Sequence, residues 1–189
     1  MRLLLNLSFF LFCFFISFHS FTKETWLLDK KLSSIHFNLP VLFVKNVKGE
    51  FKEIEGLVEI DVETHRKNKA IFSVNLNSIE MNYNKYKSLL MSEIFFHTNK
   101  FPIALVDTKK FSYKNEVQIN LEVELSIKGI SKTVPLQLQI LHLAEELVQI
   151  KGKVKFSRTA FHVGTGKWKN TSILKDKASI DVNLFLFRE

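Results

Sequence analysis

Cysteine, proline and glycine are all scarce in this chain. The single cysteine, Cys13, lies in an apolar N-terminal stretch, so a chain cut after that stretch has no thiol. Disulfides, cysteine zinc sites and thiol catalysis are then excluded, and the domain must be held by its core and its backbone ladder. With three prolines and six glycines in 189 residues, no Pro/Gly-rich linker divides the chain, and we predict one domain.

Catalytic and cofactor motifs are also missing from the sequence. The histidines outside the N-terminal stretch are isolated, and none has a partner at the spacing of helical metal sites. The chain has no Gly-x-Ser-x-Gly elbow, phosphate-binding glycine loop or dinucleotide fingerprint. Glu122 and Glu124 share the polar face of one predicted strand, which is no argument for acid–base catalysis. We therefore predict a protein that is not an enzyme and uses no metal or cofactor.

Residues 1–20 have the composition of a secretory signal peptide. Arg2 supplies a positive charge, Leu3 to Phe18 are almost entirely apolar, and small or polar residues follow up to Ser20. The apolar run is short for a membrane span, which needs about 20 residues. We predict a signal peptide at 1–20, a mature domain at 21–189 and a periplasmic location. The alternative is an uncleaved signal anchor that tethers the domain.

Strict alternation of apolar and polar residues dominates the rest of the chain. It runs from Val117 to Ile127, stops at Gly129, and resumes from Val134 to Ile140, which predicts a long antiparallel hairpin. Similar patterns predict strands near 33–39, 47–51, 58–62, 70–76, 147–157 and 177–187, and another at 102–113, which is apolar on both faces near its start. Residues 83–96 have helical spacing instead, which predicts one short helix. Many short strands at close spacing indicate an all-β barrel or sandwich.

Positive charge is in excess, with a formal net charge of +8. Lysines recur on predicted polar strand faces, as at Lys151, Lys153 and Lys155. These lysines fit either a solvated sheet face or transient attraction to an anionic membrane surface, and both interpretations stay open. No recognition-helix or aromatic-basic pattern points to nucleic acid. The sequence is compatible with a monomer or a homodimer.

Large apolar side chains fall on one face of the predicted strands, among them Phe37, Phe51, Phe72 and Phe156. A small barrel either fills its interior with such side chains or holds one small ligand. Composition alone leaves both possibilities open.

Several motifs, in this order, resemble those of the YceI-like family of exported lipid-binding proteins. They are Trp26-Leu27-Leu28-Asp29, Ser33-Ser34-Ile35-His36-Phe37, Gly49-Glu50-Phe51, Phe95-Phe96, Lys100-Phe101-Pro102, the segment 125–136 and the segment 156–164. The resemblance implies an extended, antiparallel, lipocalin-like barrel with a short helix capping one end. It also implies an interior that holds a long lipophilic chain, a polyisoprenoid or fatty-acid derivative. The chain departs from the family pattern at 40–42 and 85–89, so ligand identity does not transfer.

The expected ligand-binding residues follow from strand parity and from this resemblance. Parity places Phe37, Phe72, Val123, Leu125, Ile127, Leu136, Leu138 and Phe156 inside the barrel. The helical segment would cover the barrel with Leu90, Phe95 and Phe96. Arg158 is either a contact for a polar head group or a structural hydrogen-bond donor, and Trp168 either lines the pocket or packs on a loop. The rival functions are an envelope accessory protein with a filled barrel and a protein partner, and an enzyme acting on a bound lipid.

Overall fold

The computed structural model describes residues 23–41 and 44–189, so the predicted signal peptide lies outside the described residues. Within these ranges the chain forms eleven strands, one α-helix and three short 3-10 helices. The strands are β1 (Lys23–Leu28), β2 (Ser34–Val41), β3 (Val44–Phe51), β4 (Ile54–Asp61), β5 (Lys69–Asn75), β6 (Ile79–Met81), β7 (Ile103–Asp107), β8 (Gln118–Ile127), β9 (Ile130–Ala144), β10 (Leu147–Ser157) and β11 (Lys177–Arg188). The helices are η1 (Leu76–Ser78), α1 (Asn84–Met91), η2 (Thr159–Phe161) and η3 (Gly166–Lys169).

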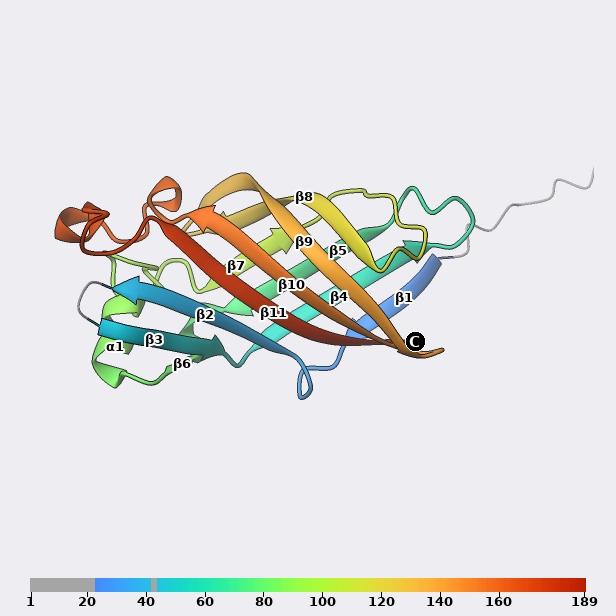
Figure 1. Ribbon diagram of the computed structural model, residues 1–189, viewed down its shortest axis with the longest axis horizontal. Coiled ribbons are helices and arrows are strands. Elements are labelled where there is room, and N and C mark those ends of the chain that lie inside the picture. Colours follow the sequence, from blue (N-terminus) through green and yellow to red (C-terminus); the bar gives the residue numbers. More distant parts are fainter. Residues whose placement is uncertain (1–22, 42–43) are drawn as a thin grey trace, which may run out of the picture.

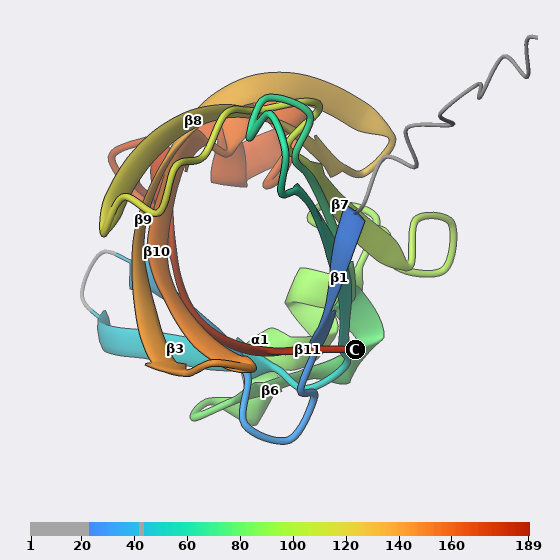
Figure 2. The same ribbon diagram turned by 90° about the vertical axis from the view of Figure 1, so that its right-hand side faces the viewer.

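Eight of these strands close into an antiparallel barrel, which Figure 2 shows end on. The pairing order is β1-β4-β5-β7-β8-β9-β10-β11, and β11 pairs in turn with β1. Successive side chains of a strand point alternately into the barrel and out of it. The apolar residues at every second position of the sequence therefore form an apolar barrel interior. The predicted all-β, lipocalin-like barrel with one short helix is confirmed.

The other three strands lengthen the wall at one end. β11 pairs with β1 through residues 186–188 and with β2 through residues 179–183, so both strands share one edge of β11. β3 and β6 then follow β2 in the sheet. α1 comes after β6 and lies at the same end of the molecule as the loops between β10 and β11 (Figure 1). We call residues 83–101, 128–129 and 157–177 the cap.

The predicted hairpin is confirmed as β8 and β9, with Val123 opposite Val134. Its turn is tighter than the sequence indicates, because Lys128 and Gly129 alone connect the strands, with φ angles of 52° and 73°. Positive φ at both central residues is the geometry that matches the twist of a two-residue hairpin. Pro135 has no N–H to donate to a neighbouring strand. It lies in β9 one residue beyond Leu136, the last β9 residue that pairs with β10.

The predicted helix is present but shorter than 83–96. α1 ends at Met91, and Ser92 takes an extended conformation with φ of −67° and ψ of 166°. The Ser92 hydroxyl donates to the Leu89 carbonyl, and the Phe96 N–H bonds back to the Leu90 carbonyl. Phe95 and Phe96 therefore lie in a turn after the helix. The apolar residues keep a helical spacing in the sequence there, but the backbone is not helical.

The predicted strand at 102–113 is wrong over its second half. β7 ends at Asp107, and Lys109 has a φ of 54°, which a strand does not accommodate. The Thr108 backbone N–H still donates to the Ala70 carbonyl at 3.0 Å, but the Ala70 N–H donates to the Thr108 side chain, at 2.8 Å, instead of to a backbone carbonyl. Two further strands, β1 and β6, are absent from the alternation-based prediction.

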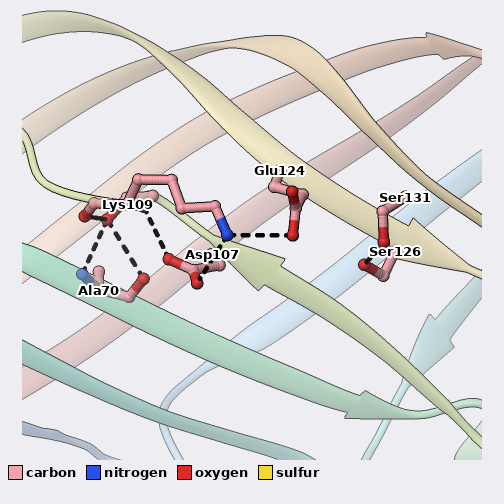
Figure 3. A network of polar contacts seen from close by, with 7 residues as sticks. Ala70, Asp107, Lys109, Glu124, Ser126 and Ser131 are labelled. Atoms are coloured by element: carbon pink, nitrogen blue, oxygen red, sulfur yellow. Dashed lines mark hydrogen bonds and ion pairs between the residues drawn. The ribbon is translucent and has the colours of Figure 1, made fainter.

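A polar network covers the outer wall where β5, β7 and β8 meet (Figure 3). The Lys109 ammonium lies 3.3 Å from Asp107 and 3.1 Å from Glu124. Burial alone would raise the pKa of Asp107, but hydrogen bonds from Lys109 outweigh burial and hold that pKa below its ordinary value. Such exposed pairs contribute little stability, about 0–1 kcal/mol each. Glu124 is thus engaged with a lysine on the outer surface, away from the barrel interior.

Candidate functional site

Two apolar cavities occupy the barrel interior and share part of their lining. The cavity under the cap, which we call the cap chamber, has a volume of about 120 Å³. The second, the mouth chamber, has a volume of about 300 Å³. Five aliphatic residues line both chambers and form a waist between them: Ile35, Val74, Val106, Val154 and Val182. A space for one water needs only about 10–15 Å³, so this interior is hollow rather than packed solid.

Two phenylalanine rings lie against the barrel wall because glycine stands opposite each of them. Phe37 of β2 pairs with Gly49 of β3, and Phe72 of β5 pairs with Gly56 of β4. A Cβ atom on either glycine would overlap the facing ring. Any side chain there would push the ring inward, so these two pairs help to keep the chambers open.

The far end of the mouth chamber is its polar part. The Arg188 guanidinium lies 3.2 Å from the Glu24 carboxylate, 3.3 Å from Glu145, and 5.9 Å from the centre of the Trp26 ring. All four side chains line the chamber, and the three charged ones are partly or fully exposed, so the chamber reaches solvent here. The positive charge of Arg188 is already matched by two carboxylates.

A second polar pair lies on the same rim. The Tyr113 hydroxyl lies 3.2 Å from Nε2 of His142, and both side chains line the mouth chamber. Burial, with a smaller contribution from Glu116, raises the pKa of the Tyr113 hydroxyl, which favours its neutral form. We call Glu24, Tyr113, His142, Glu145 and Arg188 the rim.

Arg158 is buried in the cap, with only 1% of its surface exposed. All five of its N–H donors are used by backbone carbonyls, those of Val163, Gly164, Trp168, Leu174 and Lys175, at 2.7 to 3.2 Å. Burial lowers the pKa of the guanidinium, and the nearby Asp176 carboxylate partly offsets this. The arrangement fits the structural role named from the sequence, because no donor remains for a ligand head group.

Asp176 accepts hydrogen bonds from the start of the same loop, residues 157–176. Its carboxylate accepts from the Thr159 hydroxyl at 2.6 Å and from the Ser157 hydroxyl at 3.0 Å. Burial alone would raise the pKa of Asp176, but these hydrogen bonds outweigh burial and lower it. Arg158 and Asp176 together hold residues 157–176 in one arrangement over the barrel end.

The sequence-predicted interior residues divide between the chambers. Those that line the cap chamber are Phe37, Leu90, Phe95, Phe96, Leu125, Ile127, Phe156 and Arg158. Those that line the mouth chamber are Phe72, Leu136 and Leu138. Val123 and Trp168 line neither chamber. Val123 is buried, with 1% exposed, and Trp168 packs edge-on against Phe95 at 5.8 Å, outside the cap-chamber lining.

Sequence reasoning missed the waist and the rim. Strand parity was a usable signal for the waist, because Ile35, Val74 and Val182 alternate with outward residues on their strands. No signal was available for the rim pair, since Tyr113 lies in the loop after β7 and meets His142 only through the fold.

Metal chemistry and membrane-spanning helices find no support in the described ranges. Among residues 23–41 and 44–189, no group of three or more His, Cys, Asp or Glu side chains is placed to hold a metal ion. Over the same residues, no helix has the length and apolar character needed to cross a membrane.

Comparisons with solved structures identify the same barrel in three other proteins. The crystal structure of Burkholderia cenocepacia BcnA superposes with a TM-score of 0.76 at 23% identity, covering 84% of this chain and 98% of BcnA. A polyisoprenoid-binding domain from Saccharophagus degradans gives 0.71 at 13% identity, covering 87% and 98%. The Campylobacter jejuni YceI protein gives 0.68 at 22% identity, covering 79% and 89%.

Sequence comparison agrees with the structural one. A UPF0312 protein of Shewanella denitrificans is 28% identical over 105 residues, which are 56% of this chain and 55% of that protein. The chain thus spans about half the length of the curated relatives it matches. The model of the YceI-like domain matches residues 26–186, nearly the whole described chain. The chain therefore belongs to the YceI-like domain family.

Proposed function

We propose that this protein holds one long-chain lipophilic molecule, a polyisoprenoid or a fatty-acid-like lipid, for sequestration or transport. The observation that carries the proposal is the pair of apolar chambers that share an aliphatic lining, the waist. A flexible chain can occupy both chambers and pass the waist, and each buried CH₂ group contributes about 0.8 kcal/mol. The similar domain from Saccharophagus degradans, described as polyisoprenoid-binding, supports the same ligand class. Family and fold point to a binding protein rather than to an enzyme.

The orientation of the ligand follows from where polar side chains remain available. Most polar side chains that line the mouth chamber lie at the rim, whereas every donor of Arg158 is already used. A few placed polar groups at the mouth of an apolar pocket are what fixes a ligand's direction. We place the polar head at the rim and the tail through the waist into the cap chamber. A filled barrel with a protein partner, the main alternative, is disfavoured by the hollow interior.

Chain length is the property that tests this proposal. Delipidated protein is titrated with prenyl alcohols of increasing length, and binding is followed by the fluorescence of Trp26, which lines the mouth chamber, and Trp168 in the cap. We expect saturable one-to-one binding whose affinity rises with length until both chambers are occupied and then levels off. Affinity that is independent of chain length, or no saturable binding, would refute the proposal.

Export to the periplasm is a separate proposal, carried by the composition of residues 1–20. We expect the mature protein to begin near residue 21, as measured by N-terminal sequencing of material from the periplasmic fraction. An intact N-terminus in the membrane fraction would support the signal-anchor alternative instead. An intact protein in the cytoplasm would contradict export in either form.

A further inference from the structure

The net positive charge of residues 23–189 lies at one end of the barrel. The cap carries nine basic residues and two acidic ones, Glu93 and Asp176. The remainder of residues 23–189 carries seventeen basic and seventeen acidic residues. The whole excess of positive charge in this range therefore belongs to the cap, although lysines are distributed along the full sequence.

The segments of the cap form one connected surface. The Lys128 ammonium donates to the Glu93 carbonyl at 2.7 Å and to the His162 carbonyl at 3.0 Å. The N–H groups of Gly164 and Thr165 donate to the Ile94 carbonyl at 2.9 and 3.0 Å. Figure 1 shows α1 and the 157–177 loops at the same, left end of the molecule. Basic residues that are far apart in the sequence thus lie on one surface.

Most of the cap lysines face solvent. Arg158 points inward and Lys128 bridges two loops, which leaves seven lysines. Lys87 is half-buried, and the other six are exposed: Lys85, Lys100, Lys167, Lys169, Lys175 and Lys177. Within the described residues, none of these six lies in an ion pair with a carboxylate. The Asp176 carboxylate, one of the two acids, is held by Ser157 and Thr159. The field of these lysines is therefore directed outward.

Large apolar side chains are exposed among these lysines. The exposed fractions are 39% for Tyr83, 40% for Ile94 and 37% for Ile173. Lys85 lies over the ring of Tyr86 at 5.2 Å, and Lys167 lies over Trp168 at 5.7 Å. Lysines mixed with exposed isoleucine and aromatic side chains are typical of surfaces that bind the headgroup region of an anionic membrane.

We propose that the cap docks onto the surface of a membrane that contains anionic lipids. The lysines supply long-range attraction to the negative surface, and Tyr83, Ile94 and Ile173 supply short-range apolar contact. Docking in this orientation places the cap chamber beside the bilayer, because Leu90, Phe95 and Phe96 belong to the cap and line that chamber. This last step rests on the proposed function, whereas docking itself does not require a bound lipid.

The test compares two charge-matched variants of the mature protein. The cap variant carries Lys167→Gln, Lys169→Gln, Lys175→Gln and Lys177→Gln. The control variant carries Lys31→Gln, Lys110→Gln, Lys114→Gln and Lys151→Gln, four exposed lysines outside the cap. Flotation measures binding to vesicles of phosphatidylcholine with or without about a third of phosphatidylglycerol. Because a lysine near an anionic surface contributes about fivefold in affinity, the cap variant should lose about a hundredfold or more.

The expected result is that wild-type protein and the control variant float with phosphatidylglycerol vesicles only, and the cap variant does not. Equal losses in both variants would overturn the proposal, because net charge alone would then explain binding. It would also be overturned by wild-type protein that fails to float, or that binds heparin but no vesicles. Circular dichroism checks folding, and the double variant with Lys167→Gln and Lys169→Gln alone replaces the cap variant if that one unfolds. The same variants are also titrated with prenyl alcohol, and we expect both to bind it as the wild type does. Loss of vesicle binding without loss of prenyl alcohol binding separates membrane docking from the proposed lipid-binding function.

Discussion

Replacing Arg158 with lysine should lower the free energy of unfolding by about 3–5 kcal/mol. The guanidinium donates to five buried or half-buried carbonyls, whereas an ammonium has three donors and cannot reach the same set. At least two carbonyls then lose their partner, at about 1–3 kcal/mol each. In a chain of this size the midpoint of thermal unfolding should fall by about 10 °C or more. The measurement is thermal and urea unfolding followed by circular dichroism.

The matched control for this change is Arg66→Lys. Arg66 is an exposed residue in the loop between β4 and β5, so its replacement should alter stability by no more than about 0.5 kcal/mol. If Arg158→Lys were as stable as Arg66→Lys, the five hydrogen bonds would not hold the cap as we describe.

Replacing Val106 with phenylalanine should divide the interior at the waist. Val106 lines both chambers, so a ring at this position fills the passage between them. A prenyl alcohol long enough to need both chambers should bind at least about a hundredfold more weakly, because several CH₂ groups lose burial at about 0.8 kcal/mol each. One short enough for the mouth chamber alone should bind almost as before. Titration of both ligands against the wild-type and variant proteins measures this difference.

The control is Leu105→Phe, one residue earlier on the same strand. Leu105 is exposed on the outer wall, so the added ring meets solvent and both ligands should bind as in the wild type. Overpacking at Val106 is expected to cost about 1–3 kcal/mol of stability without loss of the β spectrum. Equal loss of the long and the short ligand in a folded Val106→Phe protein would contradict a continuous two-chamber site.

Much of the barrel is predictable from local pattern, because alternation encodes which face of a strand is buried. The β8–β9 hairpin follows directly from residues 117–140 and from Gly129. The prediction errs where the residue pattern of a helix or strand continues beyond the end of that helix or strand. Helical spacing runs past Met91, although α1 ends there, and the predicted strand runs past Asp107, although positive φ at Lys109 stops the strand. The division of one edge of β11 between β1 and β2 depends on non-local register and has no local signal.

The site is only partly predictable for the same reason. Parity identifies inward residues, but it does not tell Leu125, which lines a chamber, from Val123, which is packed beside it. The role of Arg158 depends on carbonyls up to 17 residues along the chain. The lysines appear evenly distributed in the sequence, and only the fold gathers those of the cap. Each of these properties arises from tertiary contacts rather than from residue type or spacing.

The central claim, that the barrel holds a long-chain lipid, is tested most directly by native mass spectrometry of protein purified from its own cell envelope. We predict the mass of the polypeptide plus one discrete adduct per chain, which organic extraction removes and which fragments as a long-chain lipid. Protein found only at the mass of its polypeptide, with no lipid in the extract, would contradict the account.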